Sequence, residues 1–210
     1  MKNQTKYWDT KGYKKESTTK FDIDLFNLFV NKNDTICDYG CGYGRILSLL
    51  DMNGFSNLTG YDVSKKMVER GIKENPSLQF NVLNNEYEIE SKYDAVILNG
   101  VLTCIIKDNE QLDLMSHLYK ILNKNGIIYI SDFLLNTDQR NIIRYSKHLD
   151  NYRQYGVFEL DDGAILRHHS LQWVLALTKP FKKLFFKETS FPTMNNNKSK
   201  GFTFVGRKNY

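Results

Sequence analysis

The most informative segment of the chain is Ile36-Cys37-Asp38-Tyr39-Gly40-Cys41-Gly42-Tyr43-Gly44-Arg45. It joins the apolar segment 35–39 to the amphipathic segment 45–52, so it is predicted to connect a buried strand to a helix. Glycines adopt backbone dihedrals that other residues avoid, and they let a ligand approach the main chain closely. In an open parallel sheet, ligands bind beyond the carboxyl ends of the strands. The segment therefore predicts a ligand-binding turn.

The first 135 residues alternate apolar strands with amphipathic helices. The sequence predicts strands at 35–39, 57–62, 78–83, 93–99 and 126–133, and helices at 21–30, 45–52, 65–74 and 109–122. Ser64 is expected to cap the helix at 65–74. Buried strands separated by helices are typical of a parallel sheet with helices on both faces, so the predicted fold class is α/β.

The regular alternation ends after residue 134. A polar helix is predicted at 137–149 and a hairpin with arms at 156–160 and 164–168, around the turn Asp161-Asp162-Gly163. A helix at 170–178 and two strands at 181–191 and 201–207 complete the chain. We find no internal repeat and no linker that would divide it.

The composition indicates one folded domain. The chain has 210 residues, of which 41% are hydrophobic and 25% charged, and these proportions exclude a wholly disordered protein. No apolar run is long enough for a membrane span, and the first residues lack the apolar core of a secretory signal. Three cysteines in a chain of this length do not indicate a disulfide framework, so a cytoplasmic protein is expected.

The positive charge is concentrated at the two ends of the chain. The net charge is +5, yet residues 1–20 hold six Lys and two acids, and residues 179–210 hold eight Lys or Arg and one acid. Nucleic-acid binding requires a continuous basic face, whereas charge runs at termini are more often solvated. The sequence therefore argues against a nucleic-acid partner.

Two acids accompany the glycine-rich segment. The glycines follow the spacing G-x-G-x-G, in which the third glycine comes one residue earlier than in the dinucleotide-binding fingerprint. Asp38 precedes the first glycine by two positions, and Asp62 ends the next predicted strand. A carboxylate at the end of that strand can accept hydrogen bonds from the ribose hydroxyls of a nucleoside.

Together these features resemble the class I S-adenosylmethionine-dependent methyltransferase family, whose fold is Rossmann-like. Residues 38–44 match its first motif, D-x-G-C-G-x-G, and Asp62 matches its acid after strand two. Residues 93–102 match its fourth strand, and residues 122–126 match an L-x-x-G-G motif in which Asn125 replaces a glycine. The resemblance covers residues 20–135. It implies a mostly parallel seven-stranded sheet whose last strand is antiparallel, with an insertion after strand five.

The resemblance also implies the cofactor, S-adenosylmethionine, and the residues that contact it. Asp38 would help to hold the ammonium group, Asp62 would bind the ribose and Val63 would lie against the adenine. Asn84 stands where the family often has an acid that reaches the adenine amino group. Asn99 and Gly100 would flank the sulfonium. The predicted cofactor contacts are Asp38, Gly40, Cys41, Gly42, Gly44, Asp62, Val63, Asn84, Asn99 and Gly100.

The chain is accordingly predicted to be one methyltransferase domain, 1–210, in four parts. These are an N-terminal helical cap (1–34), a cofactor-binding core (35–135), an acceptor-side insertion (136–178) and a terminal strand pair (179–210). The insertion lies where this family commonly builds its acceptor site.

The insertion carries the candidate acceptor and catalytic residues. Tyr152, Tyr155 and Arg167 are predicted to bind the acceptor, and His168 or His169 to act on it, because histidine is the usual general base near neutral pH. Neighbouring side chains of an extended segment point to opposite faces, so at most one of these histidines is expected to face a pocket. Structural roles for these residues are the alternative.

Two other groups of residues have simple interpretations. Cys37 and Cys41 are four residues apart, but no second ligand pair has matching spacing, so no metal site is predicted. Cys104 is expected to be an inert buried thiol. Tyr7 and Trp8 precede the first clear helix and either fold over the cofactor or pack against the core.

The leading functional hypothesis is methyl transfer from S-adenosylmethionine to a small-molecule acceptor by in-line displacement. Methylation of RNA or protein is an alternative, although no separate RNA-binding module is visible and Asn99 is followed by Gly-Val-Leu rather than by the Pro-Pro-Tyr of base-amino methylases. A protein that binds the cofactor without transferring methyl is a third possibility. A monomer or homodimer is expected.

Overall fold

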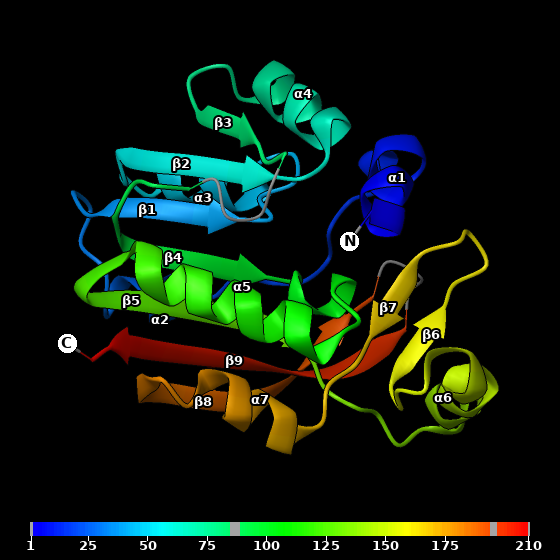
Figure 1. The fold of residues 1–210 in the computed structure, drawn as a ribbon. Coiled ribbons are helices and arrows are strands. Elements are labelled where there is room, and N and C mark those ends of the chain that lie inside the picture. The colour runs from blue at the N-terminus through cyan, green and yellow to red at the C-terminus, as the bar shows by residue number, and fades with distance from the viewer. Residues whose placement is uncertain (1, 85–88, 194–196, 210) are drawn as a thin grey trace.

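A seven-stranded sheet forms the centre of the molecule (Figure 1). In this computed structural model, residues 2–84, 89–193 and 197–209 are described. The strand order is β3-β2-β1-β4-β5-β9-β8. The strands are β1 (Thr35–Tyr39), β2 (Asn57–Asp62), β3 (Gln79–Val82), β4 (Tyr93–Asn99), β5 (Leu122–Phe133), β8 (Phe181–Pro192) and β9 (Lys198–Lys208).

The direction of the strands confirms the predicted fold class. β1 pairs in parallel with β2 and β4, β2 with β3, and β4 with β5. The last strand, β9, inserts between β5 and β8 and is antiparallel to both. The sheet is therefore seven-stranded and Rossmann-like, and β9 is its antiparallel strand.

The residues of β4 show why the sheet is covered on both faces. Ala95, Val96, Ile97 and Leu98 are all fully buried. Alternate residues of a strand face opposite sides of the sheet. Val96 and Leu98 belong to one hydrophobic cluster and Ala95 and Ile97 to the other. A strand in this position is apolar throughout because neither of its faces meets water.

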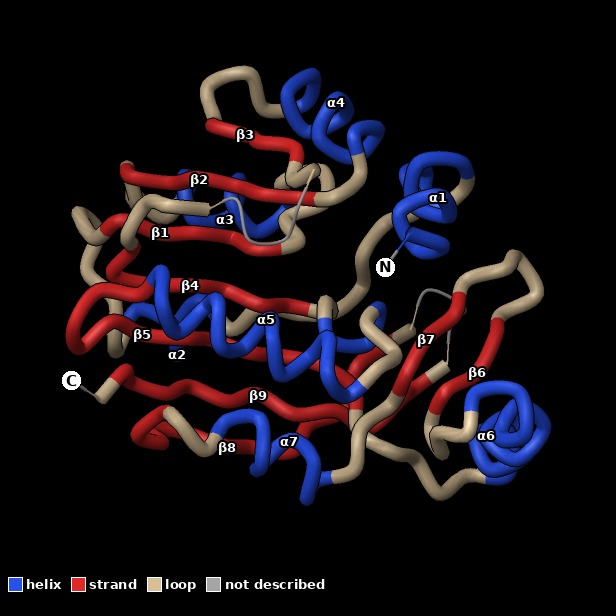
Figure 2. Tube along the Cα trace, in the orientation of Figure 1, coloured by secondary structure: helices blue, strands red, loops and turns tan. Residues whose placement is uncertain are grey.

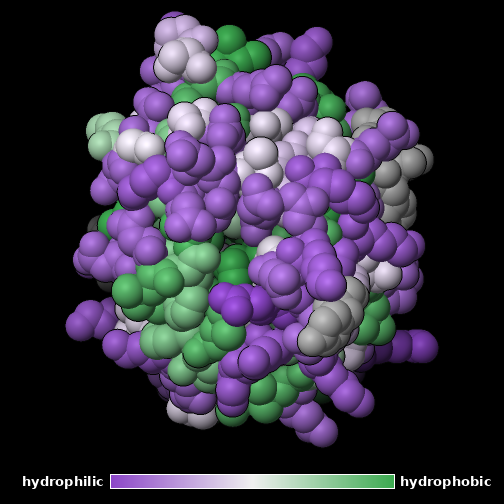
Figure 3. All heavy atoms as spheres, turned by 90° about the vertical axis from the view of Figure 1, so that its left-hand side faces the viewer, coloured by the Kyte–Doolittle hydropathy of each residue, from purple (hydrophilic) through white to green (hydrophobic). Residues whose placement is uncertain are grey.

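Helices close both clusters. The first cluster includes Leu118 of α5 (Asp108–Ile121) and Leu177 of α7 (Leu171–Thr178). The second includes Phe26 of α2 (Ile23–Asn27) and Leu47 of α3 (Arg45–Met52). Figure 2 shows α5 and α7 on one side of the sheet and α2 and α3 on the other. The face at the amino ends of the parallel strands is mainly hydrophilic, with hydrophobic residues gathered over one part of it (Figure 3).

Most element boundaries lie within a few residues of the predicted ones. Ser64 caps α4 (Lys65–Glu74), since its hydroxyl accepts a hydrogen bond from the Met67 amide. The helix predicted at 21–30 is shorter, because α2 covers only Ile23–Asn27. The N-terminal segment also forms α1 (Lys2–Thr10) and the 3₁₀ turn η1 (Gly12–Lys14).

The insertion after β5 stands at the carboxyl ends of the parallel strands. It contains α6 (Gln139–Tyr152) and the predicted hairpin, formed by β6 (Val157–Glu159) and β7 (Ile165–Arg167). Figure 1 shows α1 between this hairpin and α4. Segments from the start and the middle of the chain therefore meet beyond the same edge of the sheet.

Among the helices in the described part of the chain, none combines the length and the apolar character that a bilayer crossing requires.

Candidate active site

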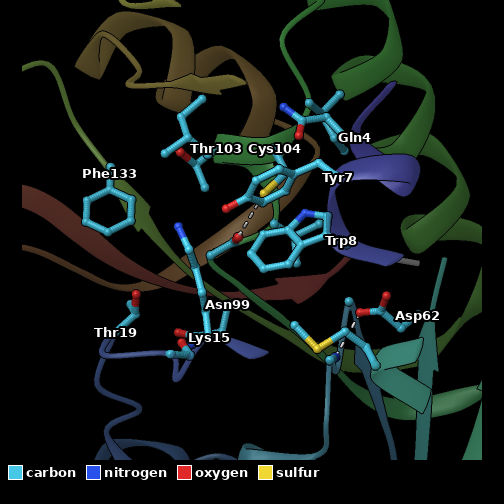
Figure 4. A pocket seen from close by; sticks show the side chains of 18 of the residues that line it. Gln4, Tyr7, Trp8, Lys15, Thr19, Asp62, Asn99, Thr103, Cys104 and Phe133 are labelled. Carbon is cyan, nitrogen blue, oxygen red and sulfur yellow. Dashed lines mark hydrogen bonds between the residues drawn. The ribbon is translucent and has the colours of Figure 1, made fainter. Parts of the chain in front are cut away.

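A cavity of about 250 Å³ opens at the carboxyl ends of β1, β2 and β4. The glycine-rich loop after β1 forms one part of its wall, and the loop after β4 forms another. α1 and the insertion supply the remainder. Figure 4 shows Tyr7 and Trp8 extending from α1 into this space. The predicted cofactor residues that line it are Asp38, Gly40, Cys41, Gly42, Asp62, Val63, Asn99 and Gly100.

Two glycines form an open cradle in the wall. Gly42 and Gly100 have φ angles of 55° and 71°, which side-chain-bearing residues rarely adopt. A Cβ atom placed on Gly42 would meet nothing closer than Met67 Sδ at 3.9 Å, and one on Gly100 nothing closer than Thr19 Oγ1 at 3.9 Å. Side chains at these positions would therefore project into free space, where a ligand could approach the backbone.

Gly44 differs from these two and corrects one prediction. It does not line the cavity. It is the N-cap of α3 with a φ of 83°, and a Cβ atom there would lie 2.4 Å from the ring of Phe80. The tight packing of the turn into α3 against Phe80 of β3 explains the glycine at this position.

Asp38, at the end of β1, has a buried carboxyl group that is not fully hydrogen-bonded. Its side chain is 2% exposed, and Oδ2 has no hydrogen-bond partner among the described residues. Burial raises the pKa of Asp38 to about 7; Arg45 lowers that pKa and Asp62 adds to the rise. A buried acceptor without a partner costs free energy, so the site suits a ligand that brings a cation or an N–H donor. The Oδ1 atom of Asn99 is unpaired in the same way.

Asp62 holds the glycine loop against the end of β2. Its Oδ2 accepts a hydrogen bond of 2.8 Å from the Gly42 amide, and Oδ1 accepts one of 2.8 Å from the Ser64 amide. Burial raises the pKa of Asp62 to about 6, although these two backbone donors lower it. Each carboxylate oxygen has a second lone pair, so the side chain can still accept hydrogen bonds from the cavity.

The side of the cavity next to Asp62 is apolar. Val63, which is predicted to lie against the adenine, lines this side of the cavity together with Met67 and Leu83. Asn84 does not line it, and Asn85 lies outside the described residues. The residue after β3 that lines the cavity is therefore Leu83 rather than Asn84, and its side chain can pack against a planar group but cannot form a hydrogen bond.

The N-terminal segment closes the cavity by linking α4 to the hairpin. Asp9 of α1 accepts a hydrogen bond of 2.7 Å from the Ser64 hydroxyl at the start of α4. At the other side, Asp162 in the hairpin turn accepts a hydrogen bond from Tyr7 and forms an ion pair with Lys15. Of the two interpretations of the N-terminal aromatics, the structure places Tyr7 and Trp8 in the cavity wall.

His168 lies at the far end of the cavity, in the wall formed by the insertion. Its ring stacks on Phe133 at 5.3 Å between centroids, and its Nδ1 lies 2.6 Å from the hydroxyl of Tyr145. Burial lowers the pKa of His168 well below its ordinary value, with Arg144 and then His169 and Arg140 adding to the effect. The ring is therefore neutral at physiological pH.

His169 points elsewhere, as the alternation of an extended segment requires. Its Nε2 lies 2.8 Å from Gln111 Nε2, and its Nδ1 lies 3.1 Å from the Phe133 carbonyl. It is fully buried and does not line the cavity. The predicted catalytic role of His169 is thus replaced by a structural one, because its hydrogen bonds join the insertion to α5 and β5.

The three predicted acceptor residues are also outside the cavity wall. Arg167 is 2% exposed and pairs with Asp108 Oδ1 at 2.6 Å, which anchors β7 to the start of α5. The hydroxyl of Tyr152 donates to Glu159, and the ring of Tyr155 packs on Tyr145. These side chains hold the insertion together, so their predicted contact with the acceptor is corrected.

Several residues of the wall were not identified from the sequence. Arg140 and Arg144 of α6 line the end of the cavity next to His168, as do Leu160 and Leu166 of the hairpin. The two arginines are four residues apart on a predicted helix, so the sequence does indicate that they share one face of it. Cys104 also lines the cavity, but burial raises the pKa of its thiol to about 12, consistent with an inert side chain.

The described residues contain no group of three or more metal-ligating side chains. The three cysteines are free thiols.

An open parallel sheet with a glycine cradle and two acids at its carboxyl edge defines a nucleoside-binding α/β protein. Comparisons with known proteins narrow this class. A family model described as "Methyltransferase domain" matches residues 18–178. The chain therefore belongs to the family of S-adenosylmethionine-dependent methyltransferases.

The individual relatives have low sequence identity to this chain and align with only part of it. The chain is 27% identical over 122 residues to a ribosomal protein L11 methyltransferase of Thermosipho melanesiensis, covering 56% of this chain and 45% of the relative. It is 34% identical over 119 residues to malonyl-[acyl-carrier protein] O-methyltransferase 1 of Ilyobacter polytropus, covering 52% and 43%. The chain thus spans about half the length of these curated relatives.

Solved structures share the fold. A methyltransferase from Methanosarcina mazei superposes with a TM-score of 0.82 at 20% identity, covering 88% of this chain and 97% of the other. A magnesium protoporphyrin IX methyltransferase from Synechocystis, crystallised with bound S-adenosylhomocysteine, gives a TM-score of 0.72 at 16% identity, covering 98% and 99%. At such identities the likeness concerns the architecture alone.

Proposed function

We propose that this protein transfers the methyl group of S-adenosylmethionine to a small-molecule acceptor held at the His168 end of the cavity. One observation carries the proposal. A single cavity joins the acids and glycines at the strand ends to Phe133, Phe158 and His168 in the insertion. A cofactor at the first end and an acceptor at the second would face each other within it.

The residues at the strand ends suit the cofactor. Asp38, with its unpaired buried oxygen, would accept a hydrogen bond from the ammonium group of the methionine part. The free lone pairs of Asp62 would accept the ribose hydroxyls, while Val63 and Leu83 would pack against the adenine. The backbone at Gly42 and Gly100 would lie directly against the cofactor.

When bound, the cofactor supplies an electrophilic methyl group on its sulfonium. This chain must then align the acceptor and exclude water, since orientation and desolvation carry much of the rate of such a transfer. Tyr7 and Trp8 cover the cavity from α1. Their position shields the space between the two ends from solvent.

His168 is the group best placed to accept a proton from the acceptor. Tyr145 Oη lies 2.6 Å from His168 Nδ1 and 3.3 Å from Asn141 Oδ1, which has no proton to give. The Asn136 amide also donates to Tyr145, and Asn136 Nδ2 lies 3.4 Å from the same Nδ1, so these contacts are compatible with either tautomer of His168. We propose the tautomer in which Nδ1–H donates to Tyr145 and Tyr145 donates to Asn141, which leaves the lone pair on Nε2. A low pKa keeps this nitrogen unprotonated but makes it a weak base, so it would first orient a hydroxyl or amine acceptor and take the proton as the acceptor becomes acidic during methyl transfer.

The arrangement of α1 favours a small acceptor over RNA or protein. α1 and its hydrogen bonds run across the cavity mouth from α4 to the hairpin. A macromolecular acceptor would need this bridge to open. The names of the relatives span protein and small-molecule acceptors, so they do not decide between these classes.

The proposal is tested by incubating the protein with S-adenosylmethionine and pools of small molecules and measuring S-adenosylhomocysteine formation. Ribosomal RNA and total protein serve as parallel acceptor pools. Turnover with small molecules alone is the expected result. Turnover only with the macromolecular pools contradicts the small acceptor, and tight cofactor binding without turnover in any pool supports the non-catalytic alternative.

A further inference from the structure

Arg144 is a largely enclosed cation in the wall of the acceptor end. It lies on α6, four residues after Arg140, and both arginines line the cavity. Its guanidinium carbon stands 3.6 Å from the centre of the Phe158 ring. The guanidinium is therefore fixed against an aromatic face rather than extended into solvent.

This guanidinium has no carboxylate to balance it among the described residues. Arg144 forms no ion pair there, and its Nε is buried without a hydrogen-bond partner. Arg167, the fully buried arginine of the insertion, also has an unpaired Nε, but its charge is balanced by an ion pair with Asp108 at 2.6 Å. A desolvated cation is unfavourable unless an anion or several acceptors compensate it. An anion or hydrogen-bond acceptors of a ligand could reach Arg144 from the cavity.

The electrostatics of the acceptor end agree with this. Burial lowers the pKa of Arg144 and the charge of Arg140 lowers it further, whereas a hydrogen bond to Tyr145 and the more distant charge of Asp138 raise it without offsetting the effect of burial. Arg144 and Arg140 both contribute to the lowered pKa of His168. Asp138, the N-cap of α6, lies 3.7 Å from Arg140. The positive potential therefore extends into the cavity between Arg144 and His168.

The surroundings of Arg144 are otherwise apolar. Phe133, Phe158, Leu160 and Leu166 line the same end. A ligand that fits this end combines an apolar body with an anionic group. Guanidinium groups bind carboxylate and phosphate through paired, charge-assisted hydrogen bonds.

We propose that the methyl acceptor is an anionic small molecule, whose carboxylate or phosphate group is bound by Arg144 with support from Arg140. This inference rests on the proposed function, since it assigns the acceptor class for the same cavity. Arg144 then acts by orientation: it fixes the anionic end and directs the rest of the acceptor towards His168 Nε2. The alternative is that Arg144 only packs on Phe158.

The experiment uses the S-adenosylhomocysteine-loaded protein and pairs of matched probes. Calorimetry compares benzoate with benzamide, octanoate with octanamide, and phenyl phosphate with phenol. At least one anionic probe is expected to bind tenfold or more tightly than its neutral partner. Whether phenyl phosphate or benzoate binds more tightly then distinguishes phosphate from carboxylate, and either order supports the proposal.

Variants assign the effect to Arg144. Arg144→Gln should remove the preference for anions, and Arg144→Lys should keep part of it, because lysine retains the charge without the planar pair of donors. Lys147→Gln, an exposed position on the same helix, is the matched control and should behave as the wild type. Melting temperature and S-adenosylhomocysteine affinity are recorded for each variant to confirm that it is folded and loaded.

The proposal is overturned if no anionic probe is preferred, or if a folded Arg144→Gln protein keeps the full preference. In the second case Arg144 only packs on Phe158. Failure of the proposed function gives a different signature, since the protein would then not bind S-adenosylhomocysteine at all or would not turn over with any small molecule.

Discussion

Asp62 offers the sharpest test of the cofactor site, because its carboxylate has two separable tasks. Its two oxygens accept hydrogen bonds from the amides of Gly42 and Ser64, and the residue lines the cavity, where we propose that its remaining lone pairs accept the ribose hydroxyls. Asp62→Ala removes both the brace of the loop and the proposed acceptor for the ribose hydroxyls. Cofactor affinity is expected to fall for both reasons.

The magnitude follows from the energy of hydrogen bonds to charged groups, about 1.5–3 kcal/mol each. Loss of one ribose hydrogen bond corresponds to an affinity roughly 10- to 100-fold weaker, and loss of two corresponds to the product of those factors. The Asp62→Ala protein should therefore bind S-adenosylhomocysteine at least tenfold more weakly. Asp51→Ala, at an exposed acid of α3, is the control and should leave affinity unchanged.

A deoxy analogue separates the two tasks. Calorimetry with S-adenosylhomocysteine and its 2′,3′-dideoxy analogue should show that the wild type discriminates strongly between them. The Asp62→Ala protein should bind the two ligands about equally, because it has lost the group that recognises the hydroxyls. If a folded Asp62→Ala protein still discriminates as the wild type does, Asp62 only braces the loop and the ribose assignment is refuted.

Four further predictions concern other parts of the site. Gly42→Val should abolish cofactor binding without unfolding the protein, since its side chain would project into the cavity at a φ of 55°; binding at wild-type strength in calorimetry would contradict the cradle. Asp38 has a pKa raised to about 7, so the folded state retains its proton while the unfolded state loses it near pH 4. The free energy of unfolding should therefore fall as the pH rises from about 4 to 7. Denaturant titrations should show a smaller fall of this free energy for the Asp38→Asn protein than for the wild type. His168→Ala should slow turnover by roughly 10²- to 10⁴-fold with cofactor affinity unchanged, whereas His169→Ala should mainly lower the melting temperature; equal effects of both on turnover would remove the distinction. Asp162→Asn should weaken the closure of α1 and speed cofactor release in stopped-flow measurements, and the exposed neighbouring variant Asp161→Asn should not.

The architecture was predictable from the sequence because its signals are local. The strand at 93–99 is apolar at consecutive positions, and this pattern alone indicates burial on both faces of a sheet. The turn at 38–44 shows its glycines and its acid in the order in which the chain uses them. Asp62 was predictable as well, since an acid ends the strand that follows the glycine-rich turn and the next helix, in the same order as in the methyltransferase family. In each case the residues that carry the signal are neighbours along the chain.

The His168 end of the cavity, where we propose that the acceptor binds, was decided by tertiary structure alone. Arg167 looked suited to a ligand, but folding brings Asp108 to within 2.6 Å of it, and the ion pair turns it away from the cavity. His168 and His169 are indistinguishable in the sequence, and only the packing of Phe133 and Gln111 sets which ring faces the cavity. Local patterns determine which helices and strands form, because the spacing of apolar residues and the residue types of turns act between neighbours along the chain. The orientation of an insertion depends on contacts between residues far apart in the chain, and that is why the sequence determined the cofactor loop whereas the fold determined the acceptor wall.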